Sequence, residues 1–123
     1  MSSDRYSMYI GRFQPFHDGH EWCVRQILNK GKKVCIAIMD IHHVEPENNP
    51  YTYEEVLDKI SEAMVDEIQN GKVKVIKIPP IESVNYGRDV GYDFNELMPP
   101  DDIKGISATK IRNAWHCKYL VVY

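Results

Sequence analysis

The sequence contains few cysteines, and their placement does not predict disulfide bonds. Three occur among the 123 residues, Cys23, Cys35 and Cys117, so the number is odd and the separations are long. Two of them fall in apolar periodic segments, which favours buried free thiols in a reducing compartment. We therefore expect a cytoplasmic protein whose thiols are unpaired.

The sequence also lacks an excess of basic charge and any long apolar run. It has 15 Lys and Arg against 18 Asp and Glu, a formal net charge of −3, which argues against a broad nucleic-acid-binding surface. A local cationic site is still allowed, because net charge says nothing about clustering. Residues 1–4 do not form a signal peptide, and no segment approaches membrane-spanning length. We expect neither a nucleic acid nor a membrane as partner.

No repeat, linker or low-complexity tract divides the chain, so residues 1–123 are expected to form one domain. Apolar periodicity and capping signals predict strands at 6–10, 33–39 and 72–78, and helices at 20–30 and from Thr52 to Asn70. Alternating strands and helices predict an α/β fold, a short single-domain Rossmann-like parallel sheet with helices on both faces. The third strand alternates lysine with β-branched residues, which indicates a sheet edge.

The remainder of the chain has a weaker pattern. Residues 81–105 look mainly like loop, with a very short strand at 84–86. After Gly105, the run I-S-A-T-K-I-R at 106–112 predicts a helix start, with Ser107 or Ala108 near the cap. Residues 120–122 form an apolar tail expected to pack on the core or on a partner.

One segment, G-R-F-Q-P-F-H-D-G-H at 11–20, gathers groups that suit an anionic ligand. It follows the first strand and enters the first helix, where sheets of this kind bind ligands. The rings of His17 and His20 can point to one side, and each can donate a hydrogen bond and can carry charge near neutral pH. Gly19 admits a ligand to the backbone, the helix start offers N–H groups, and Arg12 adds a cation. Together these parts suit a triphosphate.

Two alternatives remain for this segment. H-x-x-H supplies two metal ligands, and Asp40, His42 and His43 after the second strand could add others, although the spacing matches no closed zinc pattern. The histidines could instead cap or pack the helix. The 106–112 run has its own alternative, an ordinary capped helix start, beside a phosphate site that uses hydroxyls and the planar fork of Arg112.

The two clusters together resemble the HxGH nucleotidyltransferase superfamily. Residues 11–20 are most similar to the archaeal type of nicotinamide-mononucleotide adenylyltransferase. N-P-Y-T-Y-E-E at 49–55 is similar to the N-P-F-T-x-x-E segment of those enzymes, and I-S-A-T-K-I-R at 106–112 matches the I-S-x-T-x-x-R signature. The resemblance implies transfer of a nucleoside monophosphate, with AMP favoured, from a nucleoside triphosphate to a phosphate-bearing acceptor such as nicotinamide mononucleotide, with release of pyrophosphate.

The resemblance also implies roles for individual residues. His17, His20 and Arg112 are the expected catalytic residues; the nucleotide would be bound by Gly11, Arg12, Phe13, Gln14, Pro15, Phe16, Gly19, Ser107 and Thr109. Mg²⁺ would accompany ATP or CTP, held by phosphates and water rather than directly by protein ligands. The acceptor or base pocket would be lined by Asp40, Asn49, Tyr51, Tyr86, Gly87, Arg88 and Asp89.

The sequence departs from this family pattern in two places. Val56 follows Glu55 where relatives often carry an arginine, and only residues 79–105 fill the space in which longer relatives have a further helix and strand. K-G-I-S-A-T-K-I at 104–111 and Y-G-R-D-V-G-Y at 86–92 are similar to segments of cytidylyltransferase-like proteins. A cytidylyltransferase for a small phosphorylated alcohol and a non-catalytic nucleotide-binding module therefore remain alternatives. An exposed strand and the apolar tail favour a homo-oligomer.

Overall fold

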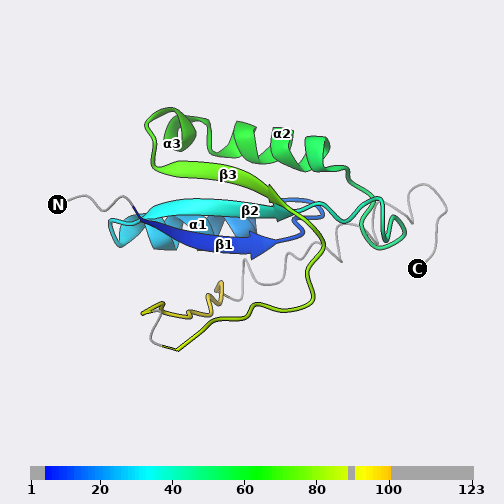
Figure 1. The fold of residues 1–123 in the computed structure, drawn as a ribbon. Helices are drawn as coiled ribbons and strands as arrows, with labels where there is room; N and C mark the ends of the chain where they lie inside the picture. Colours follow the sequence, from blue (N-terminus) through cyan, green and yellow to red (C-terminus); the bar gives the residue numbers. More distant parts are fainter. Residues whose placement is uncertain (1–4, 89–90, 101–123) are drawn as a thin grey trace.

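The computed structural model describes residues 5–88 and 91–100, which form an α/β unit around a three-stranded parallel sheet (Figure 1). The strands β1 (Tyr6–Gly11), β2 (Lys33–Met39) and β3 (Val73–Ile78) lie side by side in the order β1-β2-β3. Helix α1 (Asp18–Asn29) connects the first two strands, and α2 (Tyr53–Ala63) with α3 (Val65–Gln69) connects the last two. The predicted α/β class, parallel pairing and element order are confirmed.

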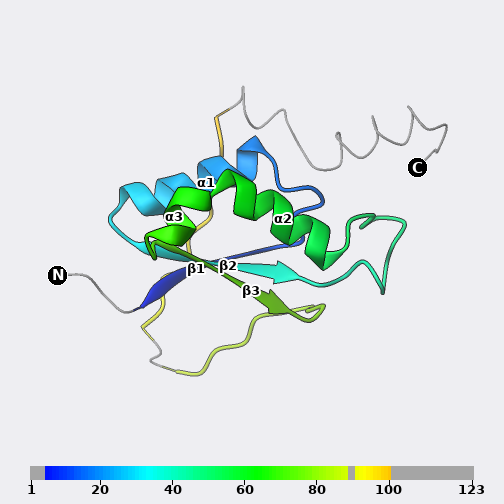
Figure 2. The ribbon, with the colours of Figure 1, turned by 90° about the horizontal axis from the view of Figure 1, so that it is seen from above.

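All three helices of the described segments lie on the same face of the sheet, as Figure 2 shows. Both crossovers step across the sheet in the same direction, so right-handed connections place their helices on the same side. Within residues 5–88 and 91–100 the structure thus differs from the expected arrangement with helices on both faces. On the opposite face, β1 exposes Tyr6, Met8 and Ile10.

The core lies between β2 and the helices. Residues 34–38 are all buried, as their unbroken apolar run predicts for a central parallel strand. The side chains on the helix side of the three strands pack against the inner faces of α1 and α2. The core members from these elements are Val24, Ile27, Val34, Ile36, Ile38, Val56, Ile60 and Val73, together with Met64 directly after α2.

The second crossover begins as predicted but ends differently. The N–H of Glu55 donates to Thr52 Oγ1 at 3.2 Å and the N–H of Thr52 donates to Glu55 Oε1 at 3.0 Å, which confirms the capping box. The predicted single helix is interrupted at Met64, whose φ of −118° and ψ of 26° leave the helical region. The apolar periodicity continues through Ile68, so the pattern did not reveal the break.

Strand β3 pairs with β2 alone in the described part of the chain, in agreement with an edge position. After Ile78 the chain turns back toward the amino-terminal ends of the strands (Figure 1), and residues 81–88 are exposed. The predicted short strand at 84–86 does not form. The expected helix at 106–112 and the tail at 120–122 lie outside the described residues, as does Cys117.

Two further expectations about the described segments can be compared with the structure. Cys23 and Cys35 are free and buried, as predicted. Among the helices described, none combines the length and the apolar character that a membrane crossing requires.

Candidate functional site

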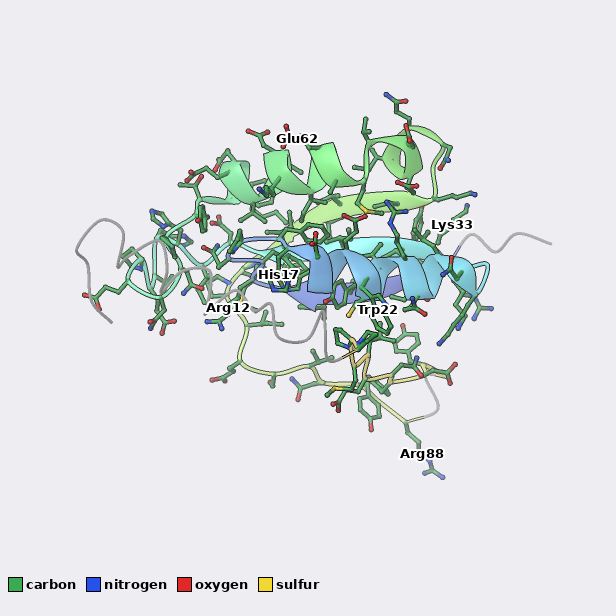
Figure 3. The ribbon with its side chains drawn as sticks, turned by 180° about the vertical axis from the view of Figure 1, so that it is seen from behind. Arg12, His17, Trp22, Lys33, Glu62 and Arg88 are labelled. Carbon is green, nitrogen blue, oxygen red and sulfur yellow. The ribbon has the colours of Figure 1, made fainter. Side chains whose placement is uncertain are left out.

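The 11–20 segment lies at the end of the sheet where ligands are expected. It leaves β1 at Gly11 and enters α1 at Asp18, beyond the carboxyl ends of the strands. Figure 3 shows Arg12 and His17 together at this end of the molecule. Arg12 is exposed and His17 is half-buried.

The two histidines cap the first turn of α1 with their Nδ1 atoms. The N–H of Gly19 donates to His17 Nδ1 at 3.0 Å, and the N–H of His17 donates to His20 Nδ1 at 3.1 Å. The rings are stacked, with centroids 3.8 Å apart. A neutral imidazole whose Nδ1 accepts a hydrogen bond carries its proton on Nε2. Capping therefore does not compete with ligand binding, because each ring keeps an Nε2–H donor.

Both rings are neutral near pH 7. Burial, with a smaller contribution from the neighbouring His17, lowers the pKa of His20 to about 3. Burial also lowers the pKa of His17 below its ordinary value. The charge that the sequence allows on these histidines near neutral pH is therefore disfavoured, and each ring offers hydrogen bonds instead.

Acidification is expected to destabilise the protein through His20. Its ring is neutral in the folded state, whereas in the unfolded chain it binds a proton below its ordinary pKa of 6.5. The unfolded state therefore binds more protons between pH 6.5 and about 3, so stability falls as the pH is lowered through this range. We expect a limiting slope of about 1.4 kcal/mol per pH unit for this group in denaturant unfolding.

The pH dependence can be assigned with a variant. His20→Gln has no ring to titrate, so its unfolding free energy should change less between pH 6.5 and 5 than that of the wild type. An identical pH slope in the two proteins would show that His20 is not responsible.

Aromatic rings fix the orientation of His20. The Phe13 ring is 2 % exposed and meets the His20 ring edge-on, with centroids 5.0 Å apart. The Phe16 ring stacks with the His20 ring, with centroids 5.6 Å apart. A Cβ on Gly11 would lie 2.8 Å from the Phe13 ring, which explains glycine at the strand end. The side chains of Phe13 and Phe16 are thus part of the core, so only their backbones are left for the predicted nucleotide contact.

The side chain of Gln14 is also engaged within the protein. Its Nε2 donates to the Tyr51 carbonyl oxygen at 2.9 Å, and the Tyr51 N–H donates to its Oε1 at 2.8 Å. The structure thereby brings the 11–20 segment to the 49–55 segment. A pocket of about 280 Å³ lies between them, lined by Pro15, Phe16, Tyr51, Glu55, Val56 and Lys59.

Asn49 is fully buried and organises the loop before α2. Its Nδ2 donates to the Glu45 backbone carbonyl oxygen at 3.0 Å. The backbone carbonyl oxygen of Asn49 lies 2.7 Å from His42 Nδ1. Asn49 Oδ1 has no hydrogen-bond partner among the described groups. The predicted role of Asn49 in the acceptor or base pocket stays a prediction. Its hydrogen bonds establish a structural role in the loop before α2.

Asp40 follows β2 and is flanked by basic groups. His43 Nδ1 lies 3.6 Å from Asp40 Oδ1, and Lys77 Nζ lies 3.9 Å from Asp40 Oδ2. Over residues 5–88 and 91–100, no three or more His, Cys, Asp or Glu side chains gather closely enough to hold a metal ion. The described residues therefore give no support to the metal-site alternative of His17 and His20 with Asp40, His42 and His43.

Arg88, predicted to line the acceptor or base pocket, is not brought to the histidines. Figure 3 shows Arg88 far from Arg12 and His17 and directed away from them. The Tyr86 ring contacts Phe94, with centroids 4.9 Å apart. The physical reason is that the chain after β3 turns back along the sheet instead of remaining at the carboxyl ends. Asp89, Ser107, Thr109 and Arg112 lie outside the described residues.

Sequence reasoning missed one feature of the site and gave another only as an alternative. The pairing of Gln14 with Tyr51 joins residues 37 positions apart, so no local pattern reveals it. Its only signal is one amide within an otherwise aromatic and proline-rich run at 13–16. The capping role of the histidine Nδ1 atoms was weighed as an alternative to ligand binding, whereas the structure makes the two compatible.

Comparison with known proteins gives a consistent family. Residues 8–122 match the family model described as cytidylyltransferase-like. Nicotinamide-nucleotide adenylyltransferase of Archaeoglobus fulgidus is 31% identical over 99 residues, which are 79% of this chain and 56% of the relative. The Thermoplasma acidophilum protein of the same name is 33% identical over 100 residues, covering 81% of this chain and 54% of the relative.

These relatives are longer proteins, and the chain spans about half of their length. Its family is nevertheless decided by a model that matches most of its residues, including the strand, loop and helix that carry the two histidines. The protein belongs to the cytidylyltransferase-like family of nucleotidyltransferases.

Proposed function

We propose that the protein transfers AMP from ATP to a phosphate-bearing acceptor of the nicotinamide mononucleotide type and releases pyrophosphate. The observation that carries the proposal is the pair of neutral Nε2–H donors on His17 and His20, fixed at the start of α1. Relatives named nicotinamide-nucleotide adenylyltransferase support the choice of acceptor and nucleotide.

The proposed reaction is an in-line substitution at the α-phosphorus. A phosphate oxygen of the acceptor forms a bond to this phosphorus while the bond to the pyrophosphate oxygen breaks. The acceptor oxygen is already ionised near pH 7, so no general base is needed. Catalysis then depends on positioning and on hydrogen bonds to the developing negative charge. His17 and His20 donate these bonds from their Nε2 atoms, because their Nδ1 atoms accept from backbone N–H groups at the start of α1.

The proposed metal requirement fits the donors of the described residues. These side chains form no metal-binding group, so Mg²⁺ would arrive with the triphosphate and be held by phosphate oxygens and water. When bound, the ion neutralises part of the phosphate charge. Arg12, exposed beside His17, adds a cation for the same phosphates.

A pyrophosphate-release assay tests the proposal. We expect release with ATP and nicotinamide mononucleotide in the presence of Mg²⁺, and none when the acceptor is omitted. CTP and glycerol 3-phosphate form the matched arm, because the family model is described as cytidylyltransferase-like. If pyrophosphate is released faster with CTP and glycerol 3-phosphate than with ATP and nicotinamide mononucleotide, the proposed adenylyl transfer is wrong and cytidylyl transfer takes its place.

A third outcome concerns catalysis itself. A nucleotide-binding module is the second candidate, because Val56 follows Glu55 where relatives often carry an arginine. Binding of ATP or CTP by calorimetry without pyrophosphate release for any acceptor in the panel would establish the module and overturn the transferase.

A further inference from the structure

We infer that Gln14 is a positioning residue. It holds residues 49–52, part of the proposed acceptor pocket, in place relative to His17 and His20. The inference rests on the proposed transferase function and deepens it. Its basis is the paired hydrogen bonds between the Gln14 amide and both backbone polar groups of Tyr51.

The contact has the geometry of a strong tether. The two bonds measure 2.9 and 2.8 Å, and Gln14 is 2 % exposed, so water competes little with them. The amide side chain donates and accepts in the same way as a backbone peptide group does in a sheet. It thereby fixes the peptide groups on both sides of Tyr51, which a single hydrogen bond would leave free to rotate.

The tether acts on two parts of the proposed site. On one side, Gln14 is three residues before His17, in the loop that starts α1. On the other side, Tyr51 directly precedes the Thr52 cap of α2. The pocket of about 280 Å³ has walls from both segments, Pro15 and Phe16 on one side and Tyr51 on the other. Gln14 therefore determines the separation of these walls.

The hydrogen bonds of the two histidines do not include this tether. Their rings are held by the backbone N–H groups of His17 and Gly19, and all of these bonds lie within residues 17–20. Loss of the Gln14 amide should therefore release the 49–52 segment while leaving the phosphate donors in place. Loss of the Gln14 amide is therefore predicted to raise the KM for the acceptor more than the KM for the nucleotide.

Gln14→Met tests the inference, because methionine keeps the length and removes both hydrogen bonds. We expect the KM for nicotinamide mononucleotide to rise about tenfold, equivalent to about 1.4 kcal/mol, and the KM for ATP to change less than threefold. The matched control is Gln69→Met, the same replacement at an exposed position of α3, with both constants unchanged. Equal rises in both KM values, or an unchanged acceptor KM, would overturn the inference.

Amide hydrogen exchange provides a readout that does not need turnover. In Gln14→Met the Tyr51 amide should exchange at least tenfold faster, while the Gly19 amide, held by His17, keeps its wild-type rate. Unchanged exchange at Tyr51, or equal acceleration at Gly19, would contradict a selective tether. Wild-type protein without turnover would contradict the proposed function, and the exchange rates would still decide the role of Gln14.

A second variant guards against a folding defect in Gln14→Met. Gln14→Glu keeps the oxygen that accepts from the Tyr51 N–H and loses the donor to the Tyr51 carbonyl. The tether predicts that this variant also raises the acceptor KM more than the ATP KM. A larger rise in the ATP KM than in the acceptor KM would contradict the positioning role of Gln14.

Discussion

His20→Ala is expected to lower turnover by about 10²–10³-fold, the effect of removing one hydrogen-bond donor aimed at developing charge. The ring is neutral, so the loss is that of a directional Nε2–H bond rather than of a cation. Pyrophosphate release measured at saturating ATP and nicotinamide mononucleotide gives the turnover. Near-normal rates with both ATP and CTP would remove His20 from the mechanism.

Two further variants separate catalysis from helix capping at this position. Alanine removes both the Nε2–H donor and the Nδ1 that accepts from the His17 N–H. Glutamate at the third helical position restores an acceptor for the cap but offers no donor. Glutamine restores an acceptor and a donor. We expect His20→Glu to retain stability without turnover, whereas His20→Gln should recover part of the turnover.

Ile36→Ala is expected to lower the free energy of unfolding by about 2–5 kcal/mol. Ile36 is 0% exposed at the centre of β2, between Tyr9 of β1 and Val75 of β3. The deleted atoms leave a cavity that the two neighbouring strands and the helices cannot readily close. Small domains have only about 5–15 kcal/mol of stability, so urea unfolding should shift to much lower concentration.

The control for this variant removes the same atoms from the surface. Ile81→Ala lies after β3 at a position that is 38% exposed, where changes within about 0.5 kcal/mol are expected. A comparable loss in both variants would mean that burial in the β2 core is not the cause.

The sequence predicted the elements whose local pattern matches their final environment. The bounds of β2 were predicted correctly because residues 33–39 are almost continuously apolar and lie between two other strands. The start of α2 was predictable because Thr52 and Glu55 form a capping box within four residues. Each of these signals is local, and the tertiary structure reinforces it.

Other features depend on contacts that a linear pattern does not contain. Met64 interrupts the helix while remaining in the core, so its burial conceals the break. The separation of Arg88 from the histidines depends on the direction that the chain takes after Ile78, which no periodicity specifies. The lowered pKa of His20 depends on its burial and on the nearby His17, which the H-x-x-H spacing alone does not determine.

The capped histidine pair has a consequence for the entropy of binding. Each ring is held by a backbone hydrogen bond and by stacking in the absence of any ligand. The rotamer freedom of these side chains is therefore lost when the chain folds. Under the proposed function, a nucleotide would find these two donors already ordered, so its binding free energy would not include the entropic cost of fixing them.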